Sequence, residues 1–399
     1  MNLGTGHFLS PLKSHVLFFG HTGSGKTTEL RRYAEHLSGP ERFFIVELDI
    51  SVVLDRNNLQ YADVLMAMAR ELFGRVKEKN IALGTDAMKD LEDWFGERIL
   101  STEEAKNFTM EMKTNTSAEG GISYLFKLFA GFTSAFKSNV TYKDSLRQVI
   151  RNSFTQFAVA FNRLLRRVEE ELVNKSLGQR VLFIIDGTDK LRNEDTINLF
   201  AKDAEQLLEI EANIVYTAPL SIKYESNLTH RLNADLMLPM IKLYDAAGTR
   251  HEVGWQTMRD ILLLRADRRM FATDQEISRL VEYSGGHPRE LLRLIKLCCE
   301  FAENDKIDAD VVDQSIRQLA SEYRRFLAPE DYMLLAALDR NKDEKLPVHM
   351  GNDDHIRKLL YNLALLEYND GSWRRSHPVI RILEGYSFAV AKLKATPSA

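Results

Sequence analysis

A glycine-rich segment from Gly20 to Thr27 restricts the fold of this chain more than any other feature of its sequence. The segment reads Gly-His-Thr-Gly-Ser-Gly-Lys-Thr and matches the pattern G-x-x-x-x-G-K-[ST]. An apolar run at 16–19 precedes it, and a helical pattern at 28–37 follows it. Glycines let the backbone N–H groups of such a loop converge on phosphate oxygens, and the start of a helix adds partial positive charge. The order of strand, loop and helix therefore predicts a phosphate-binding site.

We expect this loop to bind ATP together with Mg²⁺. In such loops the lysine reaches the β- and γ-phosphates and the hydroxyl that follows it ligates the metal ion. These roles fall to Lys26 and Thr27. The predicted nucleotide-binding residues of the loop are Gly20, His21, Thr22, Gly23, Ser24, Gly25, Lys26, Thr27 and Thr28.

An acid at the end of a second apolar run predicts the other half of the site. The run Arg180–Asp186 is typical of a buried central strand, and its terminal Asp186 is expected to hold the Mg²⁺. Asp189 is a candidate to orient or deprotonate the attacking water, although Asp-Gly-Thr-Asp is also good turn chemistry. Thr217 ends a further predicted strand and is a candidate sensor of the γ-phosphate.

The order of the predicted elements indicates an α/β fold with a parallel sheet. Strands are expected at Phe43–Ile50, Asn213–Thr217 and Leu238–Tyr244, and one long helix at Asp144–Lys175. The segment 82–141 does not fit the sheet and is expected to be a mostly helical insertion, with a buried helix favoured over an interfacial one at 122–136. We expect a P-loop core at 1–245.

The remainder of the chain is expected to form two smaller domains. A helical lid is predicted at 246–325, with a break at 284–288 where Pro288 and Arg289 start a helix. Two short helices and a hairpin with its turn at Asn369–Ser372 predict a winged-helix domain at 326–399.

Composition excludes some classes of protein. Lys plus Arg number 53 against 57 Asp plus Glu, a net charge of −4, which is no general nucleic-acid signature. Neighbouring Cys298 and Cys299 are expected to be core residues of a reduced, cytoplasmic protein. We expect no membrane span, because no apolar run is long enough, and no N-terminal signal sequence.

With these residues in hand, the chain resembles STAND-type ATPases within the wider AAA+ group. Gly20 to Thr27 matches the Walker A motif of that family, and the stretch 184–189 resembles its NACHT-like Walker B form, in which an acid follows Asp-Gly-x. Gly286-His287-Pro288 resembles the family's GxP motif, which implies that Pro288 lies near the nucleotide base. The resemblance further implies a sensor-2 role for Arg289.

The chain departs from that family in two places. Relatives often carry an arginine after the strand that here ends in Thr217-Ala218-Pro219, and Lys190 stands where a second acid is frequent. Asp189 would then act alone, and slow hydrolysis is expected. Arg231 and Arg250 are candidate arginine fingers.

The leading functional hypothesis is a nucleotide-driven switch in bacterial-type signalling or defence. ATP would permit self-association or engagement of a separate effector protein, and hydrolysis would reset the chain. The alternative is a DNA-binding ATPase of the initiator or loader type, because the tail carries basic residues among acids: Arg357, Lys358, Arg374, Arg375 and Arg381 against Asp343, Glu344, Asp353 and Asp354. A small-molecule kinase is the third alternative, and the helical lid argues against it.

Overall fold

A parallel five-stranded sheet organises the first part of the chain. The computed structural model describes residues 13–55, 59–99, 122–138, 140–223, 232, 234–303, 306–340, 354–371 and 373–395. The strand order is β2-β3-β4-β1-β5, and the strands are β1 (His15–Gly20), β2 (Phe43–Asp49), β3 (Arg180–Asp186), β4 (Asn213–Pro219) and β5 (Ala234–Met237). This arrangement confirms the predicted α/β class.

The described chain divides into two units. The first comprises Met1–Phe18, Thr27–Ala218 and Asn227–Leu236, and the second comprises Phe19–Lys26, Pro219–Ser226 and Met237–Ala399. The phosphate loop therefore belongs to the same unit as the segments predicted to form lid and wing.

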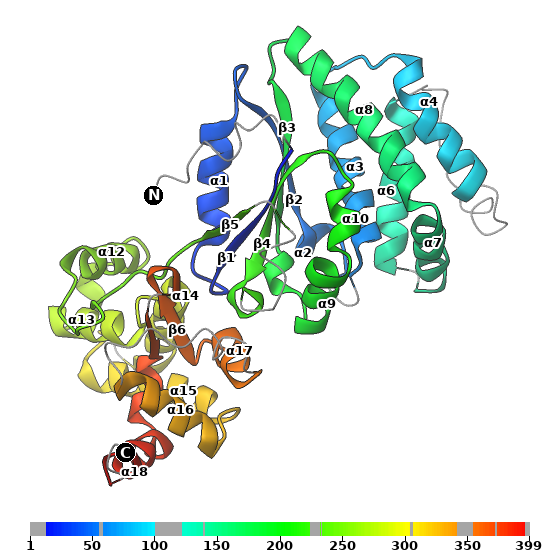
Figure 1. Ribbon diagram of the computed structural model, residues 1–399. Helices are drawn as coiled ribbons and strands as arrows, with labels where there is room; N and C mark the ends of the chain where they lie inside the picture. The colour runs from blue at the N-terminus through cyan, green and yellow to red at the C-terminus, as the bar shows by residue number, and fades with distance from the viewer. Residues whose placement is uncertain are drawn as a thin grey trace. The chain divides into compact units, whose positions relative to one another are not determined.

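Helices cover both faces of the sheet in the first unit. Figure 1 shows α1 on one side of the strands and α3, α8 and α10 on the other, as right-handed crossovers require. The described helices of this unit are α1 (Lys26–Leu37), α2 (Ile50–Val53), α3 (Tyr61–Glu78), α4 (Thr85–Trp94), α6 (Ile122–Ser138), α7 (Val140–Asn152), α8 (Phe154–Asn174), α9 (Asn193–Ile197) and α10 (Ala204–Leu208), with short segments η2 (Phe95–Ile99), η3 (Thr188–Lys190) and η4 (Asn198–Lys202).

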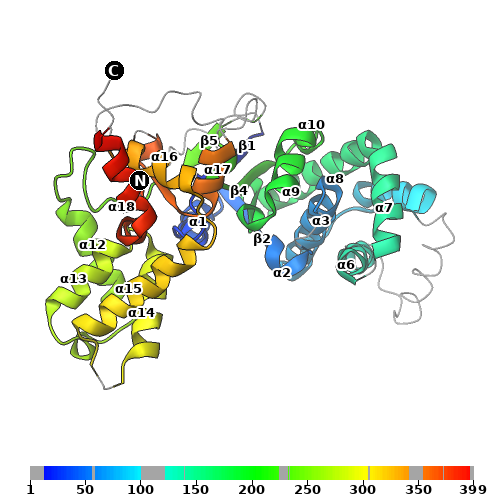
Figure 2. The same cartoon turned by 90° about the horizontal axis from the view of Figure 1, so that it is seen from below.

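The predicted insertion is helical wherever it is described from Thr85 onward, while residues 82–84 form no regular element. Helix α6 packs against α3, and α4 packs against α8, away from the strands (Figure 2). The rings of Phe73 and Phe129 stack with centroids 5.5 Å apart, and Phe95 meets Phe129 edge-on at 5.0 Å. Such aromatic contacts explain why the apolar helix at 122–138 is buried within this unit. Residues 100–121 of the insertion lie outside the described residues.

The second unit consists of helices and one hairpin. The hairpin pairs β6 (Leu365–Tyr368) with β7 (Trp373–Ser376) in antiparallel register, as its turn sequence predicted. The other elements are η5 (Leu220–Ile222), α12 (Glu252–Leu263), η6 (Arg268–Met270), α13 (Asp274–Tyr283), α14 (Pro288–Phe301), α15 (Ala309–Arg324), α16 (Pro329–Arg340), α17 (Asp354–Tyr361), η8 (Asn369–Gly371), η9 (Pro378–Ile382) and α18 (Glu384–Ala395). Hereafter "lid" means residues 238–324 and "wing" means 329–395.

Two predicted elements were wrong. The single helix expected at 144–175 is interrupted at Ser153, whose hydroxyl bonds back to the Val149 carbonyl and competes with the helical pattern. No strand forms at 238–244. The strand in this part of the chain is β5, which ends at Met237, and Pro239 has no N–H with which to extend it. Among the described residues, no helix is both long and apolar enough to cross a membrane.

A buried ion pair joins two helices of the first unit. Arg147 on α7 donates from Nε to Asp63 Oδ1 at 2.9 Å, and the side chains are 2% and 1% exposed. Asp63 also accepts the backbone N–H of Gln60 and so caps the start of α3. Loss of one partner would leave a buried charge without its counter-ion.

We therefore expect Arg147→Met to lower the free energy of unfolding by about 3–5 kcal/mol, measured by urea denaturation. The matched control is Arg166→Met, which breaks an exposed ion pair with Glu211 and should cost less than about 1 kcal/mol. Equal losses in the two variants would contradict a special contribution of the buried pair.

Candidate nucleotide-binding site

The phosphate loop leaves β1 and ends where α1 begins at Lys26. Gly23 and Gly25 have φ angles of 96° and 104°, in the left-handed region that favours glycine. Lys26 is buried, and its Nζ donates to the carbonyl oxygens of Gly20 at 2.8 Å and His21 at 2.9 Å. Ser24 Oγ is buried and makes no hydrogen bond with the described residues. The loop thus offers an ammonium group and an unused hydroxyl, both suited to phosphate oxygens.

Thr27 and Asp186 form the predicted metal-binding pair within the first unit. Thr27 Oγ1 donates to Asp186 Oδ2 at 2.6 Å, and the backbone N–H of Gly187 donates to Oδ1 at 2.8 Å. A hydroxyl and a carboxylate are oxygen ligands of the kind Mg²⁺ prefers, and that ion usually keeps water and phosphate as its other ligands. The described residues contain no group of three or more His, Cys, Asp or Glu that could hold a metal alone. The pair therefore fits a nucleotide-bound Mg²⁺.

Asp189 and Thr217 are also brought together. Thr217 Oγ1 donates to Asp189 Oδ1 at 3.3 Å, and the Thr188 hydroxyl donates to the Thr217 carbonyl. Both predicted residues are buried, at 4% and 0% exposure. The carboxylate is thus oriented by a hydroxyl from the neighbouring strand. The catalytic roles of these residues stay predictions.

Asp49 is an acidic neighbour that was not among the predicted site residues. It ends β2 and pairs in register with Asp186. A Cβ placed on Gly187 would lie 2.9 Å from Asp49 Oδ1, and Gly187 itself has a φ of 87°. That oxygen already accepts the backbone N–H of Ser51 at 2.9 Å. The sequence contained one signal for Asp49, because it is an acid near the end of the strand predicted at 43–50. That strand pairs with the one that ends in Asp186.

Of the two predicted lid residues, Arg289 lies next to the phosphate loop inside the second unit. Pro288 is the first residue of α14, and His287 caps this helix by accepting the Glu290 N–H on Nδ1 at 3.2 Å. A Cβ placed on Gly23 would lie 2.5 Å from Arg289 Nε, so this arginine is next to the loop. The nucleotide contacts expected of Pro288 and Arg289 stay predictions.

Only one of the two candidate arginine fingers, Arg250, is among the described residues. Arg231 lies outside the described residues. The guanidinium of Arg250 lies 4.0 Å from the ring centre of Trp255, and its Nε is 2.8 Å from Glu252 Oε1. Arg250 is therefore engaged within its own unit.

Three buried histidines meet where loop, lid and wing converge in the second unit. His21 Nε2 accepts the backbone N–H of Glu367 at 2.9 Å, and His377 Nδ1 accepts that of Val379 at 3.4 Å. His287 accepts from Glu290 in the same way. A ring nitrogen that accepts a hydrogen bond carries no proton, so these contacts require neutral imidazoles.

Burial is the main reason that these histidines stay neutral. It lowers the pKa of His21 and of His377 to about 3, and it lowers the pKa of His287 well below the ordinary value. Nearby cations act in the same direction: Lys26 and Arg374 beside His21, Arg381 and Arg293 beside His377, and Arg289 beside His287.

Together these features define a class of protein. A glycine loop between β1 and α1, with Asp186 at the end of a parallel strand in the order β2-β3-β4-β1-β5, forms a P-loop nucleoside-triphosphate-binding fold. No protein-family model matches the sequence, and no curated protein matches it.

Several solved structures match this chain over most of its length, at low sequence identity. Cdc6p from Pyrobaculum aerophilum shares 11% identity at a TM-score of 0.36, over 98% of this chain and 92% of that protein. Aeropyrum pernix ORC2 shares 12% at 0.35, over 99% and 91%. Drosophila ORC bound to DNA shares 12% at 0.37, over 96% and 83%.

The histidine cluster predicts that acid destabilises the second unit. Because the folded pKa values lie below the unfolded value of 6.5, the unfolded chain binds more protons once the pH falls below about 6.5. His21 and His377 should each remove up to about 1.4 kcal/mol of stability per pH unit between pH 6.5 and 3, and His287 adds to the loss in the same direction. Urea denaturation at a series of pH values would measure the slope.

The variant His377→Gln should reduce that slope, because one titrating group is removed. His36→Gln is the control, since this histidine is exposed on α1. A stability that is flat between neutral and mildly acidic pH would contradict the assignment of three neutral histidines.

Proposed function

We propose that this chain binds ATP with Mg²⁺ and hydrolyses it. The observation that carries the proposal is the 2.6 Å hydrogen bond between Thr27 and Asp186. Thr27 directly follows Lys26 at the start of α1, so the metal-binding hydroxyl and the phosphate-binding ammonium come from consecutive residues. The metal-binding carboxylate of Asp186 comes from the end of β3. This set of groups supports a nucleoside triphosphate rather than a lone phosphate.

Each residue has a distinct proposed role. Lys26 would neutralise charge on the β- and γ-phosphates, and Thr27 and Asp186 would hold the Mg²⁺, which when bound offsets further phosphate charge. Asp189 would take the proton of the attacking water. Thr217 donates to Asp189, so we assign it the orientation of that carboxylate, in addition to the contact with the γ-phosphate expected from the sequence.

The same proposal includes a switch of the STAND type. In the second unit the phosphate loop is bonded to the wing through His21 and Glu367, and it lies against Arg289 of the lid. A nucleotide that binds one arrangement of these elements more tightly than another would shift their populations. The expected outputs are self-association or engagement of a separate effector protein.

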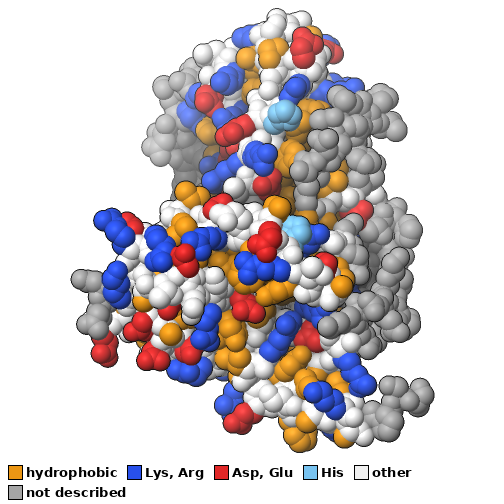
Figure 3. Space-filling model, turned by 90° about the vertical axis from the view of Figure 1, so that its left-hand side faces the viewer, with side chains coloured by type: hydrophobic (Ala, Val, Ile, Leu, Met, Phe, Trp, Pro, Cys, Tyr) orange, Lys and Arg blue, Asp and Glu red, His pale blue; other side chains and the backbone are white. Residues whose placement is uncertain are grey.

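A DNA-binding ATPase is the second proposal. A winged-helix hairpin is a common DNA-binding element, but here Arg374 is buried and paired with Glu367 at 2.6 Å. Arg357 pairs with Asp354, and Lys358 with Asp331 at 2.9 Å. Basic and acidic side chains also lie interspersed on the face drawn in Figure 3. Of the tail acids noted above, Asp343, Glu344 and Asp353 lie outside the described residues.

Two substitutions separate binding from hydrolysis. Lys26→Ala should abolish ATP binding in a calorimetric titration, because the loop loses its phosphate cation. Asp186→Asn should retain nucleotide affinity within roughly tenfold and lower the hydrolysis rate by at least about a hundredfold. Arg31→Ala, exposed on the same helix, is the control. Full ATPase activity in Lys26→Ala would refute the proposed function.

Assembly distinguishes the switch from the DNA-binding ATPase. We expect a larger mass by light scattering with a non-hydrolysable ATP analogue than with ADP, and no such increase for Lys26→Ala. DNA affinity that falls steeply with salt would instead favour the second proposal. A mass that is independent of nucleotide, together with no DNA binding at low salt, would contradict both outputs.

A further inference from the structure

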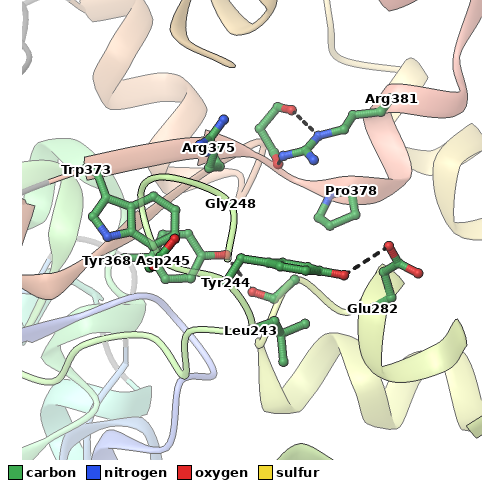
Figure 4. Close-up of a pocket in the computed structure, with 12 residues that line it drawn as sticks. Leu243, Tyr244, Asp245, Gly248, Glu282, Tyr368, Trp373, Arg375, Pro378 and Arg381 are labelled. Carbon is green, nitrogen blue, oxygen red and sulfur yellow. Dashed lines mark hydrogen bonds between the residues drawn. The ribbon is translucent and has the colours of Figure 1, made fainter. Parts of the chain in front are cut away.

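A cavity of about 300 Å³ lies between lid and wing, wholly within the second unit. The lid contributes Leu243, Tyr244 and Glu282, and the wing contributes Trp373, Arg375 and Arg381. Figure 4 shows the wing residues Arg375, Pro378 and Arg381 opposite the lid residues Leu243, Tyr244 and Glu282. No residue of the phosphate loop lines this lid–wing pocket, so it is separate from the nucleotide site proposed above.

The pocket has flat aromatic walls. Tyr368 and Trp373 stack with ring centroids 4.1 Å apart and planes 10° apart, and both pack against a small core cluster with Met240 and Leu366. The Tyr368 hydroxyl is fixed by the Gly285 carbonyl at 2.7 Å. The ring of Tyr244 projects from the lid between these groups and Glu282 (Figure 4). Rigid aromatic faces of this kind favour a planar ring as ligand.

Two arginines supply fixed positive charge. Arg375 donates from Nη1 to the Asp339 carbonyl at 3.1 Å and from Nη2 to the Ala246 carbonyl at 2.8 Å. It makes no ion pair with the described residues. Arg381 donates to Ser376 through Nε and Nη2, each at 3.0 Å, and its Nε lies 3.4 Å from Asp339. A guanidinium has five N–H donors, so both side chains are held in place with donors to spare.

The acids of the pocket already have donors. Glu282 accepts from the Tyr244 hydroxyl at 3.4 Å. Asp245 accepts the backbone N–H of Thr249 at 2.7 Å, and this hydrogen bond is the main cause that lowers the pKa of Asp245. The cations are instead held chiefly by carbonyl and hydroxyl oxygens. The lining therefore holds two acids and two arginines, and the guanidinium donors that these bonds leave unused can bind a ligand that brings negative charge.

We propose that the lid–wing pocket binds a small planar aromatic anion. The ring would lie against Tyr244 and Trp373, and its acidic group would accept hydrogen bonds from Arg375 and Arg381. Such a ligand contacts lid and wing at once, so it would stabilise their mutual packing in proportion to its occupancy. The proposed site would act independently of ATP hydrolysis.

Calorimetry on the full chain with 2-naphthoate tests the proposal. We expect saturable binding with a Kd below about 1 mM, and Arg381→Gln should weaken it roughly tenfold or more, because a charge-assisted hydrogen bond is lost. The matched control is Arg279→Gln, whose side chain is 41% exposed against 42% for Arg381 and lies outside the pocket. Lys26→Ala should bind 2-naphthoate like the unmodified chain, even if the proposed ATPase function fails.

Two further probes test which feature of the ligand is recognised. 2-Naphthamide lacks the charge, and cyclohexanecarboxylate lacks the flat ring, so both should bind at least roughly tenfold more weakly. Circular dichroism would verify that Arg381→Gln is folded, and Tyr244→Leu provides a second variant that removes one aromatic wall. No binding of 2-naphthoate, equal binding of either probe, or equal losses in Arg279→Gln and Arg381→Gln would overturn the proposal.

Discussion

The hydrogen bond between Thr27 and Asp186 is the constraint on which the candidate nucleotide site depends. It joins the first turn of α1 to the last residue of β3. Asp186 reaches this place because the apolar run 180–186 is paired on both sides, with β2 and with β4. A slip of one residue in either ladder would turn the carboxylate to the other face of the sheet. The register of a buried strand is therefore part of the chemistry of the site.

The second unit depends on a different condition, the neutrality of its buried histidines. His21 joins the phosphate loop to β6, while His287 and His377 cap the segments that follow them. All three rings accept backbone N–H groups, so none can gain a proton without losing its bond. A polar cluster of this kind is stable only when it is satisfied, so any other arrangement of loop, lid and wing must replace these hydrogen bonds.

Short-range chemistry could be predicted from the sequence, and long-range partnerships could not. The phosphate loop, the strand ending in Asp186 and the hairpin turn at 369–372 each depend on residues close together in the chain. The bond between His21 and Glu367 joins positions 346 residues apart, and a single sequence carries no pattern for it. Pro239 is an intermediate case, since its missing N–H was visible in the sequence but the apolar residues around it favoured a strand at 238–244.

The wing arginines show why charge counted along a sequence is a weak guide to a binding partner. Arg374 and Arg375 are neighbours in a strand, so their side chains point to opposite faces of the hairpin. One is buried against Glu367, and the other is held by carbonyl oxygens at the lid–wing pocket. The sequence alone would assign both arginines to DNA phosphates. In the structure Arg374 forms an internal ion pair, and Arg375 lines the pocket. The positive charge that remains available in this part of the wing faces a small pocket, which suits a small anion better than a polymer.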